Sequence, residues 1–395
     1  MDLNAEVVLD STIRLTKSNV EWVTEPDAIL LTGATGFVGP FLLNELLQQT
    51  QAKIYCLVRA DNVELGKQKI QENLKRYLLG AGDYNSRIVP VIGDLSKPLL
   101  GLPEKEFQKM ASQIDVIYHN GAWVNLISPY EKLKAANVLG TQEIFRLASQ
   151  EKVKPVHHIS TYSIFCSRHY LNSEVIREQD DLRDGNGIYL GYSQSKWVAE
   201  KLVEIARNQG IPVCIYRLGD LAGDSQTGAF NLSNFTARII TSCIRLGSIP
   251  DEDMRVDITP VDYAVRATVH LSRRQESMDK AFHLVNPQSM KWKKLFNLIE
   301  SLGYSIQQLS YTQWHSQLLE QIKQSSAHPL YPFLPLFSEQ TSEERKSIFR
   351  EYLNMPLLDC KNTLDGLTDT SIQCPPVDEK LLDTYFSSFI RSGLI

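Results

Sequence analysis

Short apolar runs alternate with helix-like stretches along most of this chain, and this alternation limits the folds that it can adopt. The alternation begins after Asp27 and predicts strands over residues 28–33, 53–59, 87–94, 116–121, 156–161, 213–219 and, late in the chain, 281–285. Strands that alternate with helices form parallel sheets, whose strands are buried on both sides and are therefore continuously apolar. We therefore predict an α/β fold with a doubly wound parallel sheet covered by helices on both faces.

Helix-like stretches lie between most of these strands. Residues 39–49 have helical spacing and follow the first predicted strand. The stretch after the second strand predicts an amphipathic helix, in which one apolar stripe contains Leu65, Ile70, Leu74 and Leu78.

The pattern changes past about residue 220, and this change divides the chain into predicted parts. Residues 1–25 are polar and form a lead-in segment, and residues 26–287 form the sheet domain. Within that domain, residues 222–255 contribute to the side that faces the substrate. Residues 288–395 combine helices with aromatic-rich loops, and we predict a smaller, mostly helical substrate domain there.

The composition argues against several classes of protein. The net charge of -5 and the pI of about 6.0 do not favour nucleic acid or an anionic membrane as partner. No apolar run approaches the ~20 residues of a membrane span, and the first residues lack the pattern of a secretory signal. The 6 cysteines form no Cys-x-x-Cys pair and the 8 histidines no His-x-x-x-His pair. We therefore expect a cytoplasmic protein with reduced thiols and no metal site.

A glycine-rich turn follows the first predicted strand and opens the first predicted helix. Gly33, Gly36 and Gly39 are spaced Gly-x-x-Gly-x-x-Gly. A tight turn and the approach of backbone N–H groups to a pyrophosphate leave no space for a Cβ atom, and the helix N-terminus adds a partial positive charge. A plain strand-to-helix turn is the alternative. The order of strand, glycines and helix favours a Rossmann-type dinucleotide site, which also includes Thr35 and Phe37.

The second predicted strand ends in Arg59, close to the place where an NAD site carries an acidic residue. A guanidinium pairs well with a 2′-phosphate, so we predict NADP(H) as the cofactor, with Lys69 on the next helix assisting. A solvated arginine at a strand end and a lysine on the wet face of a helix remain the alternative for these two residues.

Further candidates for cofactor binding follow the third and fourth predicted strands. Asp94, in the motif GDLS, is placed to accept a hydrogen bond from the adenine amino group, and Leu95 follows it. Asn120, Gly121 and Ala122 follow the fourth strand, where their backbone lines the cofactor. Each signal is weak alone, and their order along the sheet gives them weight.

Tyr192 and Lys196 lie one helical turn apart, so their side chains share one face. The pKa of a free tyrosine is about 10, and a nearby ammonium together with the cationic nicotinamide of the oxidised cofactor favours the phenolate and lowers this pKa. We therefore predict that Tyr192 gives a proton to oxygen as hydride arrives at carbon. We also predict that Lys196 hydrogen-bonds the nicotinamide ribose, so that both residues bind the cofactor as well. Tyr130 and Lys134 have the same spacing and compete for the role. Tyr192 is favoured because its helix follows the strand at residues 156–161.

That strand ends in hydroxyl groups, at the carboxyl end where open α/β sheets bind ligands. We predict that Thr161 donates a hydrogen bond to the same substrate oxygen as Tyr192, and Ser160 or Ser163 are alternatives. Capping of the strand end is the structural alternative for all of these hydroxyls.

Together, these motifs resemble a known group of enzymes. The segments TGATGFVG, LVRA, GDLS, HNGAWVN, NVLGTQEI, HHISTYSIF, YSQSK and PVDY are similar to those of extended short-chain dehydrogenase/reductases. Within that group the chain is most similar to the thioester reductase domains that end nonribosomal peptide and polyketide synthetases, and to carboxylic acid reductases. The resemblance covers nearly the whole chain. It departs at residues 216–223, where many relatives have proline after the arginine and an apolar residue in place of Asp220.

The resemblance implies a site and a reaction. Thr161, Tyr192 and Lys196 would be the catalytic residues, and the three glycines would hold the pyrophosphate. The substrate would be an acyl or peptidyl thioester on a phosphopantetheine arm, which NADPH reduces to an aldehyde and, in some relatives, on to the alcohol. The sequence contains no phosphopantetheine attachment motif, so the carrier protein or carrier domain is expected outside this chain.

Other functions stay open at the level of sequence. One is a sugar-nucleotide epimerase or dehydratase of the same superfamily, which the helical C-terminus and the LVRA motif argue against. Another is a fatty acyl-CoA reductase that acts on free CoA thioesters. A regulatory protein that only senses NADP(H) is the non-enzymatic alternative, and Tyr192 and Lys196 argue against it.

Overall fold

The computed structural model describes residues 2–15, 23–80, 86–170, 173–252, 254–288, 290–337 and 355–395. Parts of the predicted lead-in segment and of the predicted helical domain, residues 16–22 and 338–354, lie outside the described residues.

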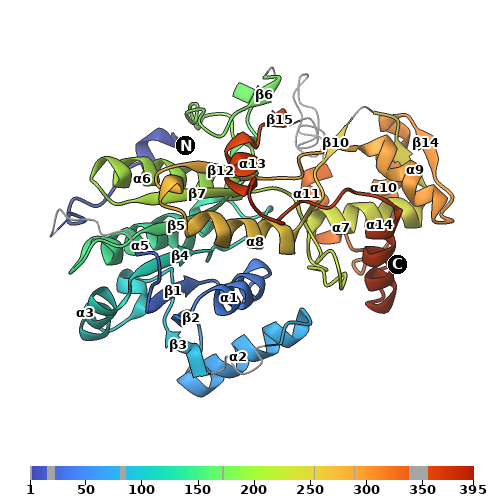
Figure 1. Ribbon diagram of the computed structural model, residues 1–395. Helices are drawn as coiled ribbons and strands as arrows, with labels where there is room; N and C mark the ends of the chain where they lie inside the picture. The colour runs from blue at the N-terminus through green and yellow to red at the C-terminus, as the bar shows by residue number, and fades with distance from the viewer. Residues whose placement is uncertain are drawn as a thin grey trace.

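A parallel sheet forms the centre of the larger part of the molecule (Figure 1). Its strand order is β12-β7-β5-β4-β1-β2-β3, and each neighbouring pair runs parallel. The strands are β1 (Ala28–Thr32), β2 (Lys53–Val58), β3 (Ile88–Ile92), β4 (Val116–His119), β5 (Val156–Thr161), β7 (Val213–Leu218) and β12 (Ala281–Leu284). All the predicted strands are present, and the predicted doubly wound fold is confirmed.

Helices cover both faces of the sheet, and each set packs into its own apolar core. One set comprises α1 (Val38–Gln49), α2 (Val63–Arg76) and α8 (Val261–Ser272). The other comprises α3 (Glu104–Gln113), α4 (Tyr130–Lys134), α5 (Gly140–Ser149) and α6 (Gly191–Asn208). Every residue of β1 is buried between these layers, which explains its unbroken apolar run.

The strand order reverses between β1 and β4, because the chain crosses from β3 to the far side of β1. Open α/β sheets bind ligands beyond the carboxyl ends of their strands at such a point. The turns that follow β1 and β4 lie side by side there, since a Cβ atom built on Gly33 would lie 2.8 Å from the Gly121 Cα. The fold therefore brings the glycine turn and the HNGA segment together.

The predicted apolar stripe of α2 is partly wrong. The helix ends at Arg76, and Leu78 lies beyond it with a φ of 60° and 67% of its surface exposed. Leu65 is 40% exposed, whereas Ile70 and Leu74 are buried. Leu65 lies five residues before Ile70, which places it about 140° away around an α-helix and therefore off the buried face.

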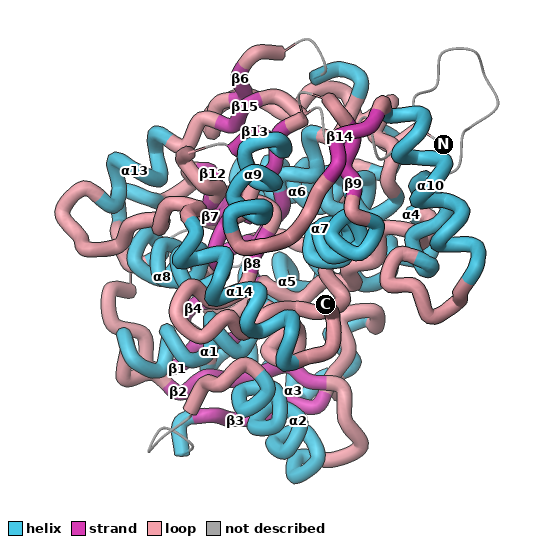
Figure 2. Tube along the Cα trace, turned by 90° about the vertical axis from the view of Figure 1, so that its right-hand side faces the viewer, coloured by secondary structure: helices cyan, strands magenta, loops and turns pink. Residues whose placement is uncertain are grey.

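Helices from the later part of the chain form the smaller part of the molecule, in front of the sheet in Figure 2. They are α7 (Phe235–Leu246), α9 (Trp292–Ser301), α10 (Tyr311–Gln324), α11 (Leu334–Phe337) and α14 (Glu379–Arg391). Their apolar side chains form a core separate from the two cores against the sheet. The helical C-terminal portion is therefore confirmed.

Short strand pairs join distant segments of the chain. They are β6 (Val175–Ile176) with β15 (Leu357–Leu358), β8 (Leu221–Ala222) with β11 (Thr259–Pro260), β9 (Ser248–Pro250) with β14 (Gln307–Leu309), and β10 (Arg255–Val256) with β13 (Met290–Lys291). The pair of β9 and β14 lies within the smaller part of the molecule, next to its core.

One late segment returns to the sheet. The helix α13 (Lys361–Leu367) packs against α8 and β12, and Glu178 fastens it there. The Glu178 carboxylate accepts hydrogen bonds from the backbone N–H groups of His283 at 2.8 Å and Thr363 at 3.2 Å. The boundary at residue 288 between two domains stays a prediction.

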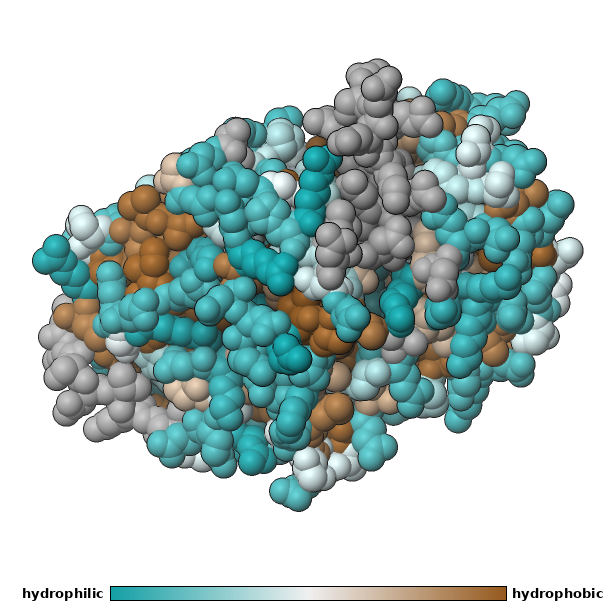
Figure 3. Space-filling view, turned by 90° about the horizontal axis from the view of Figure 1, so that it is seen from above, coloured by the Kyte–Doolittle hydropathy of each residue, from teal (hydrophilic) through white to brown (hydrophobic). Residues whose placement is uncertain are grey.

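The molecular face that carries α6 and α13 is mainly polar, with apolar side chains visible between polar ones near its middle (Figure 3). Among the residues that the structure describes, no helix combines the length and the apolar character needed to cross a bilayer. The 6 cysteines are free thiols.

Candidate active site

The glycine turn between β1 and α1 is held by close backbone contacts. Gly33 has a φ of 75°, and a Cβ atom on Gly39 would lie 2.1 Å from the Gly33 carbonyl oxygen, so both positions require glycine. Gly36 differs, because its φ is not positive and, within the described residues, a Cβ atom would meet only the Gly33 oxygen, at 3.4 Å. The fold alone does not need glycine at position 36, whereas a pyrophosphate lying against the backbone would.

This difference predicts that Gly36→Ala separates cofactor binding from folding. The free energy of unfolding should stay the same or rise by about 0.4–1 kcal/mol, because alanine restricts the unfolded chain. NADPH binding should weaken by about 1–3 kcal/mol, because the added methyl overpacks the contact with the phosphates. Calorimetric titration with NADPH measures this loss, with Gly80→Ala as control, since a Cβ atom there would meet none of the described residues within 4 Å apart from its chain neighbours. Unchanged NADPH affinity in Gly36→Ala would contradict the assignment of the turn.

The remaining predicted residues of the turn serve different roles. Thr35 is exposed at its tip, while the ring of Phe37 packs against those of Phe41 at 5.7 Å and Tyr77 at 5.3 Å. Asn73 of α2, which was not predicted from the sequence, supports the turn by donating a hydrogen bond to the Gly36 carbonyl at 2.7 Å. The signal available in the sequence for this residue was an asparagine among the apolar positions of an amphipathic helix.

The predicted 2′-phosphate residues lie together beyond β2. Arg59 and Lys69 are exposed, and the Lys69 ammonium donates a hydrogen bond to the Arg59 carbonyl at 2.8 Å. Asp94 lies near them, and its carboxylate accepts hydrogen bonds from the Ser96 backbone at 2.9 Å and hydroxyl at 2.8 Å. Burial pushes the pKa of Asp94 upward, but these hydrogen bonds and the charges of Arg59 and Lys97 hold it below its usual value. The site thus places the cationic side chains of Arg59 and Lys69 near the negatively charged carboxylate of Asp94.

A buried row of hydrogen bonds fixes the start of the HNGA loop. The Gly121 N–H donates to Thr32 Oγ1 at 2.8 Å, and Thr32 Oγ1 lies 3.0 Å from His119 Nδ1. The other ring nitrogen, His119 Nε2, lies 3.0 Å from Thr141 Oγ1. Burial, aided by the charge of Lys196, lowers the pKa of His119 to about 3, so its ring is neutral. The row therefore positions backbone groups without placing a charge beside the cofactor turn.

The rest of the HNGA loop lies against the glycine turn. The Asn120 amide donates to the Gly33 carbonyl at 3.3 Å, and Ala122 is half-buried. A Cβ atom on Gly121 would lie 2.5 Å from Leu95 Cδ1, so Leu95 packs directly over this glycine. The structure therefore brings the predicted residues of all four strand ends to one edge of the sheet.

Thr161 and Tyr192 meet beyond the carboxyl end of β5. Thr161 is buried at the end of the strand, and its side chain hydrogen-bonds the phenol of Tyr192, which is half-buried in the first turn of α6. Burial raises the pKa of Tyr192 above its ordinary value, and the hydrogen bond between Tyr192 and Thr161 offsets part of this rise. The lowering of this pKa by the Lys196 ammonium stays a prediction for the complex with the cofactor.

Lys196 lies one turn further along α6, with its ammonium buried against β5. The Nζ atom donates a hydrogen bond to the Ile159 carbonyl at 2.8 Å and lies 3.4 Å from His158 Nε2. Burial lowers the pKa of Lys196 to about 8, and the Glu200 carboxylate opposes this change. At neutral pH the side chain therefore stays mainly protonated, on the helix face that carries Tyr192.

The competing pair, Tyr130 and Lys134, has a structural role. The Tyr130 hydroxyl donates to Glu6 at 2.8 Å, and the Lys134 ammonium forms an ion pair with the same carboxylate at 2.6 Å. Both side chains thus fasten the N-terminal segment to α4.

The two alternative hydroxyl groups, those of Ser160 and Ser163, have different partners and roles. Ser160 donates to Glu200 at 2.7 Å, on the opposite side of β5 from Thr161, as the alternation of strand side chains requires. The Ser163 hydroxyl accepts a hydrogen bond from Thr161 at 3.2 Å, so it supports Thr161.

Asn137 is a site residue that was not predicted from the sequence. It lies in a π-helical turn (Ala135–Leu139) between α4 and α5, and its amide donates to Ser195 Oγ at 2.9 Å. Its side-chain oxygen accepts from the Trp123 N–H at 2.7 Å, and Ser195 donates in turn to the Tyr192 carbonyl at 2.7 Å. Asn137 thus ties the loop after β4 to the start of α6. The feature of the sequence that could have pointed to this residue is the asparagine of the NVLGT segment.

Comparisons with known proteins identify the family. Residues 31–268 match the model of a family of NAD-binding domains described as "Male sterility protein". A crystal structure of the terminal R domain from the myxalamid PKS-NRPS biosynthetic pathway superimposes with a TM-score of 0.92, with 42% identity over 100% of this chain and 98% of that chain. The chain belongs to this family and, within it, to the terminal R domains. This R domain is accordingly an oxidoreductase of the extended short-chain type with a nicotinamide cofactor.

Other similar proteins are much longer than this chain. Over 99% of its length it is 40% identical to one of the chains of linear gramicidin synthase from Brevibacillus parabrevis, of which it covers 8%. It spans 37% of the next curated relative, so it matches only part of these proteins. A thiolation-reductase di-domain from an archaeal nonribosomal peptide synthetase shares the fold, with a TM-score of 0.75 and 21% identity over 99% of this chain and 80% of that chain.

Proposed function

We propose that this chain uses NADPH to reduce the thioester of a carrier-bound acyl or peptidyl group and releases the product as an aldehyde. One observation carries the proposal: Thr161 hydrogen-bonds Tyr192 beyond the end of β5, with Lys196 one turn further along α6. This arrangement stands at the edge of the sheet where the glycine turn lies. It suits hydride transfer to a carbonyl carbon whose oxygen must receive a proton. The full-length likeness to a terminal R domain favours this reaction over sugar-nucleotide chemistry.

The residues of the chain have distinct tasks in this reaction. When bound, NADPH supplies the hydride that reduces the thioester carbonyl carbon. Tyr192 holds its proton at neutral pH, because burial raises its pKa, and gives that proton to the carbonyl oxygen as negative charge develops there. Thr161 orients the phenol through its hydrogen bond, and the ammonium of Lys196 favours the phenolate that remains. The resulting thiohemiacetal loses the carrier thiol, and the aldehyde leaves.

The cations beyond β2 support NADPH rather than NADH as the donor. Replacing Arg59 by serine should weaken NADPH binding by about 1.5–3 kcal/mol, the usual value of a hydrogen bond to a charged group, and leave NADH binding unchanged. Titration of both nucleotides measures the difference. Lys67→Ser is the matched control, because Lys67 is exposed on the same helix as Lys69. Equal losses for NADPH and NADH would refute the proposed 2′-phosphate contact.

A carrier domain loaded with phosphopantetheine is the proposed partner. The solved archaeal di-domain joins a thiolation domain to a reductase, and the curated relatives include synthetases of which this chain matches only a part. A flexible phosphopantetheine arm would carry the thioester to Tyr192. An acyl group delivered this way needs no free CoA, which distinguishes the proposal from a fatty acyl-CoA reductase.

The reaction is tested by mixing the chain with NADPH and an acyl-pantetheine thioester. We expect NADPH absorbance to fall while free thiol appears, with an aldehyde that a hydrazine reagent traps. Release of thiol without NADPH consumption would show hydrolysis instead and would reject the proposal. Turnover of acyl-CoA well above that of the same acyl-pantetheine would favour the CoA-dependent alternative.

A further inference from the structure

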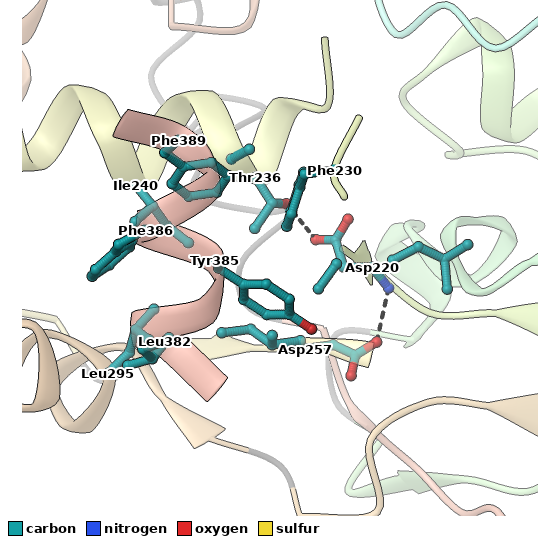
Figure 4. A pocket seen from close by; sticks show the side chains of 14 residues that line it. Asp220, Phe230, Thr236, Ile240, Asp257, Leu295, Leu382, Tyr385, Phe386 and Phe389 are labelled. Carbon is teal, nitrogen blue, oxygen red and sulfur yellow. Dashed lines mark hydrogen bonds between the residues drawn. The ribbon is translucent and has the colours of Figure 1, made fainter. Parts of the chain in front are cut away.

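A cavity lies where the smaller core meets the loops that follow β7 (Figure 4). We call it the apolar pocket, after the side chains of α7, α9 and α14 that line it. In Figure 4 the rings of Phe386 and Phe389 project from α14 and lie beside Ile240. The ring of Tyr385 points the other way, toward Asp220 and Asp257. The volume of the cavity is about 30 Å³. The proposed reaction assigns no role to this space.

The residues that line the pocket differ in how far they are buried. Its deep wall residues, such as Leu295 and Phe386, are buried, whereas Asp220, Phe230 and Thr236 are half-buried. These three residues therefore mark its mouth. Asp220 is also the residue at which the sequence departs from related domains.

The mouth lies next to the candidate active site. Leu218, the last residue of β7, pairs in register with Thr161, and Asp220 follows Leu218 by two residues, or about 7 Å of extended chain. On the other side, Leu190 precedes Tyr192 by two residues and belongs to the same apolar core as Phe386. A group attached to a carbonyl carbon at Tyr192 would thus lie close to the mouth.

The polar groups around the pocket are already paired with the protein. The Tyr385 hydroxyl donates to the Gly223 carbonyl at 3.0 Å, and Thr236 donates to the Asp220 carboxylate at 2.7 Å. Asp257 accepts from the Asp220 N–H at 2.8 Å and from the Thr259 hydroxyl at 2.8 Å. The interior therefore presents hydrocarbon and aromatic surface to a ligand. The acidic residues at its rim disfavour an anionic one.

We propose that the apolar pocket receives the apolar end of the acyl group, so that this domain favours thioesters of short, uncharged aliphatic acids. This inference rests on the proposed function and names its substrate class. The small space open within the walls limits the chain that enters without movement of α14. Each methylene that moves from water into such a pocket adds favourable transfer free energy.

The test compares acetyl-, hexanoyl- and dodecanoyl-pantetheine as substrates with NADPH. The parent should show the highest kcat/KM with the hexanoyl thioester. Ala237→Leu, which fills the pocket from α7, should lower kcat/KM for hexanoyl about tenfold and leave acetyl unchanged. Phe389→Ala, which enlarges the pocket, should raise kcat/KM for the dodecanoyl thioester relative to that for the hexanoyl thioester. Ile390→Ala is the control, because this neighbour on α14 is 57% exposed. Loss of the acetyl and hexanoyl rates in equal proportion would overturn the proposal.

A binding experiment separates failure of the pocket from failure of the reaction. Calorimetric titration of the whole chain with 1-hexanol, without NADPH, should show binding that Ala237→Leu weakens and Ile390→Ala does not. Binding with this pattern, in a chain that reduces no thioester, would support the pocket and refute the reaction. Reduction of thioesters together with hexanol binding that Ala237→Leu leaves unchanged would refute the pocket alone.

Discussion

The Tyr192→Phe variant is expected to lose about 10²- to 10⁴-fold in kcat while it still binds NADPH. Phenylalanine keeps the ring that packs at the start of α6 and removes only the hydroxyl that hydrogen-bonds Thr161. The variant therefore lacks the proton donor for the developing alkoxide but keeps the cofactor turn. Stopped-flow measurement of NADPH oxidation with acyl-pantetheine gives kcat, and calorimetry gives the dissociation constant for NADPH.

The chain provides a matched control in its other Tyr-x-x-x-Lys pair. Tyr130→Phe removes a hydroxyl from the same type of helix position and breaks the hydrogen bond to Glu6. It should lower stability slightly and leave kcat unchanged. If both variants kept the parental kcat, the assignment of Tyr192 as proton donor would be wrong.

The second large effect concerns folding. Replacing Glu200 by glutamine should lower the free energy of unfolding by about 3–5 kcal/mol, because it leaves a buried guanidinium without its counter-charge. Glu200 is 1% exposed, accepts hydrogen bonds from Arg217 Nε at 2.8 Å and Ser160 at 2.7 Å, and forms an ion pair with Arg217. Glutamine fits the space but not the charge.

Urea unfolding followed by circular dichroism measures this loss. Asp365→Asn is the control, because its ion pair with Lys361 is exposed on α13 and should contribute little to stability. A Glu200→Gln variant as stable as Asp365→Asn would show that the buried pair contributes little beyond its own desolvation.

The sheet was predictable from the sequence because parallel strands that are buried on both sides consist mainly of apolar residues. Residues 28–31 are all apolar, as burial of this strand between two helical layers requires. The glycine turn was equally clear, since strand, glycines and helix occur in order. The prediction for Leu65 was wrong because apolar character alone does not determine which side of a helix a residue occupies.

The site was predictable only in part, because several of its features depend on contacts between distant segments. Asn137 reaches Ser195 from a π-helical turn, a local backbone shape that no residue spacing encodes. The raised pKa of Tyr192 reflects burial by elements elsewhere in the chain, which the spacing to Lys196 cannot report. The apolar pocket requires α14 to pack beside α7, although many residues separate the two helices.

The most direct test of the central claim follows the hydride itself. NADPH that carries deuterium at the transferred position of the nicotinamide is incubated with the chain and a hexanoyl thioester of pantetheine, and the trapped aldehyde is examined by mass spectrometry. Our account predicts hexanal with one deuterium on its carbonyl carbon, free pantetheine in equal amount, and neither product from Tyr192→Phe at a comparable rate. Hexanoic acid, or an aldehyde without deuterium, would contradict it.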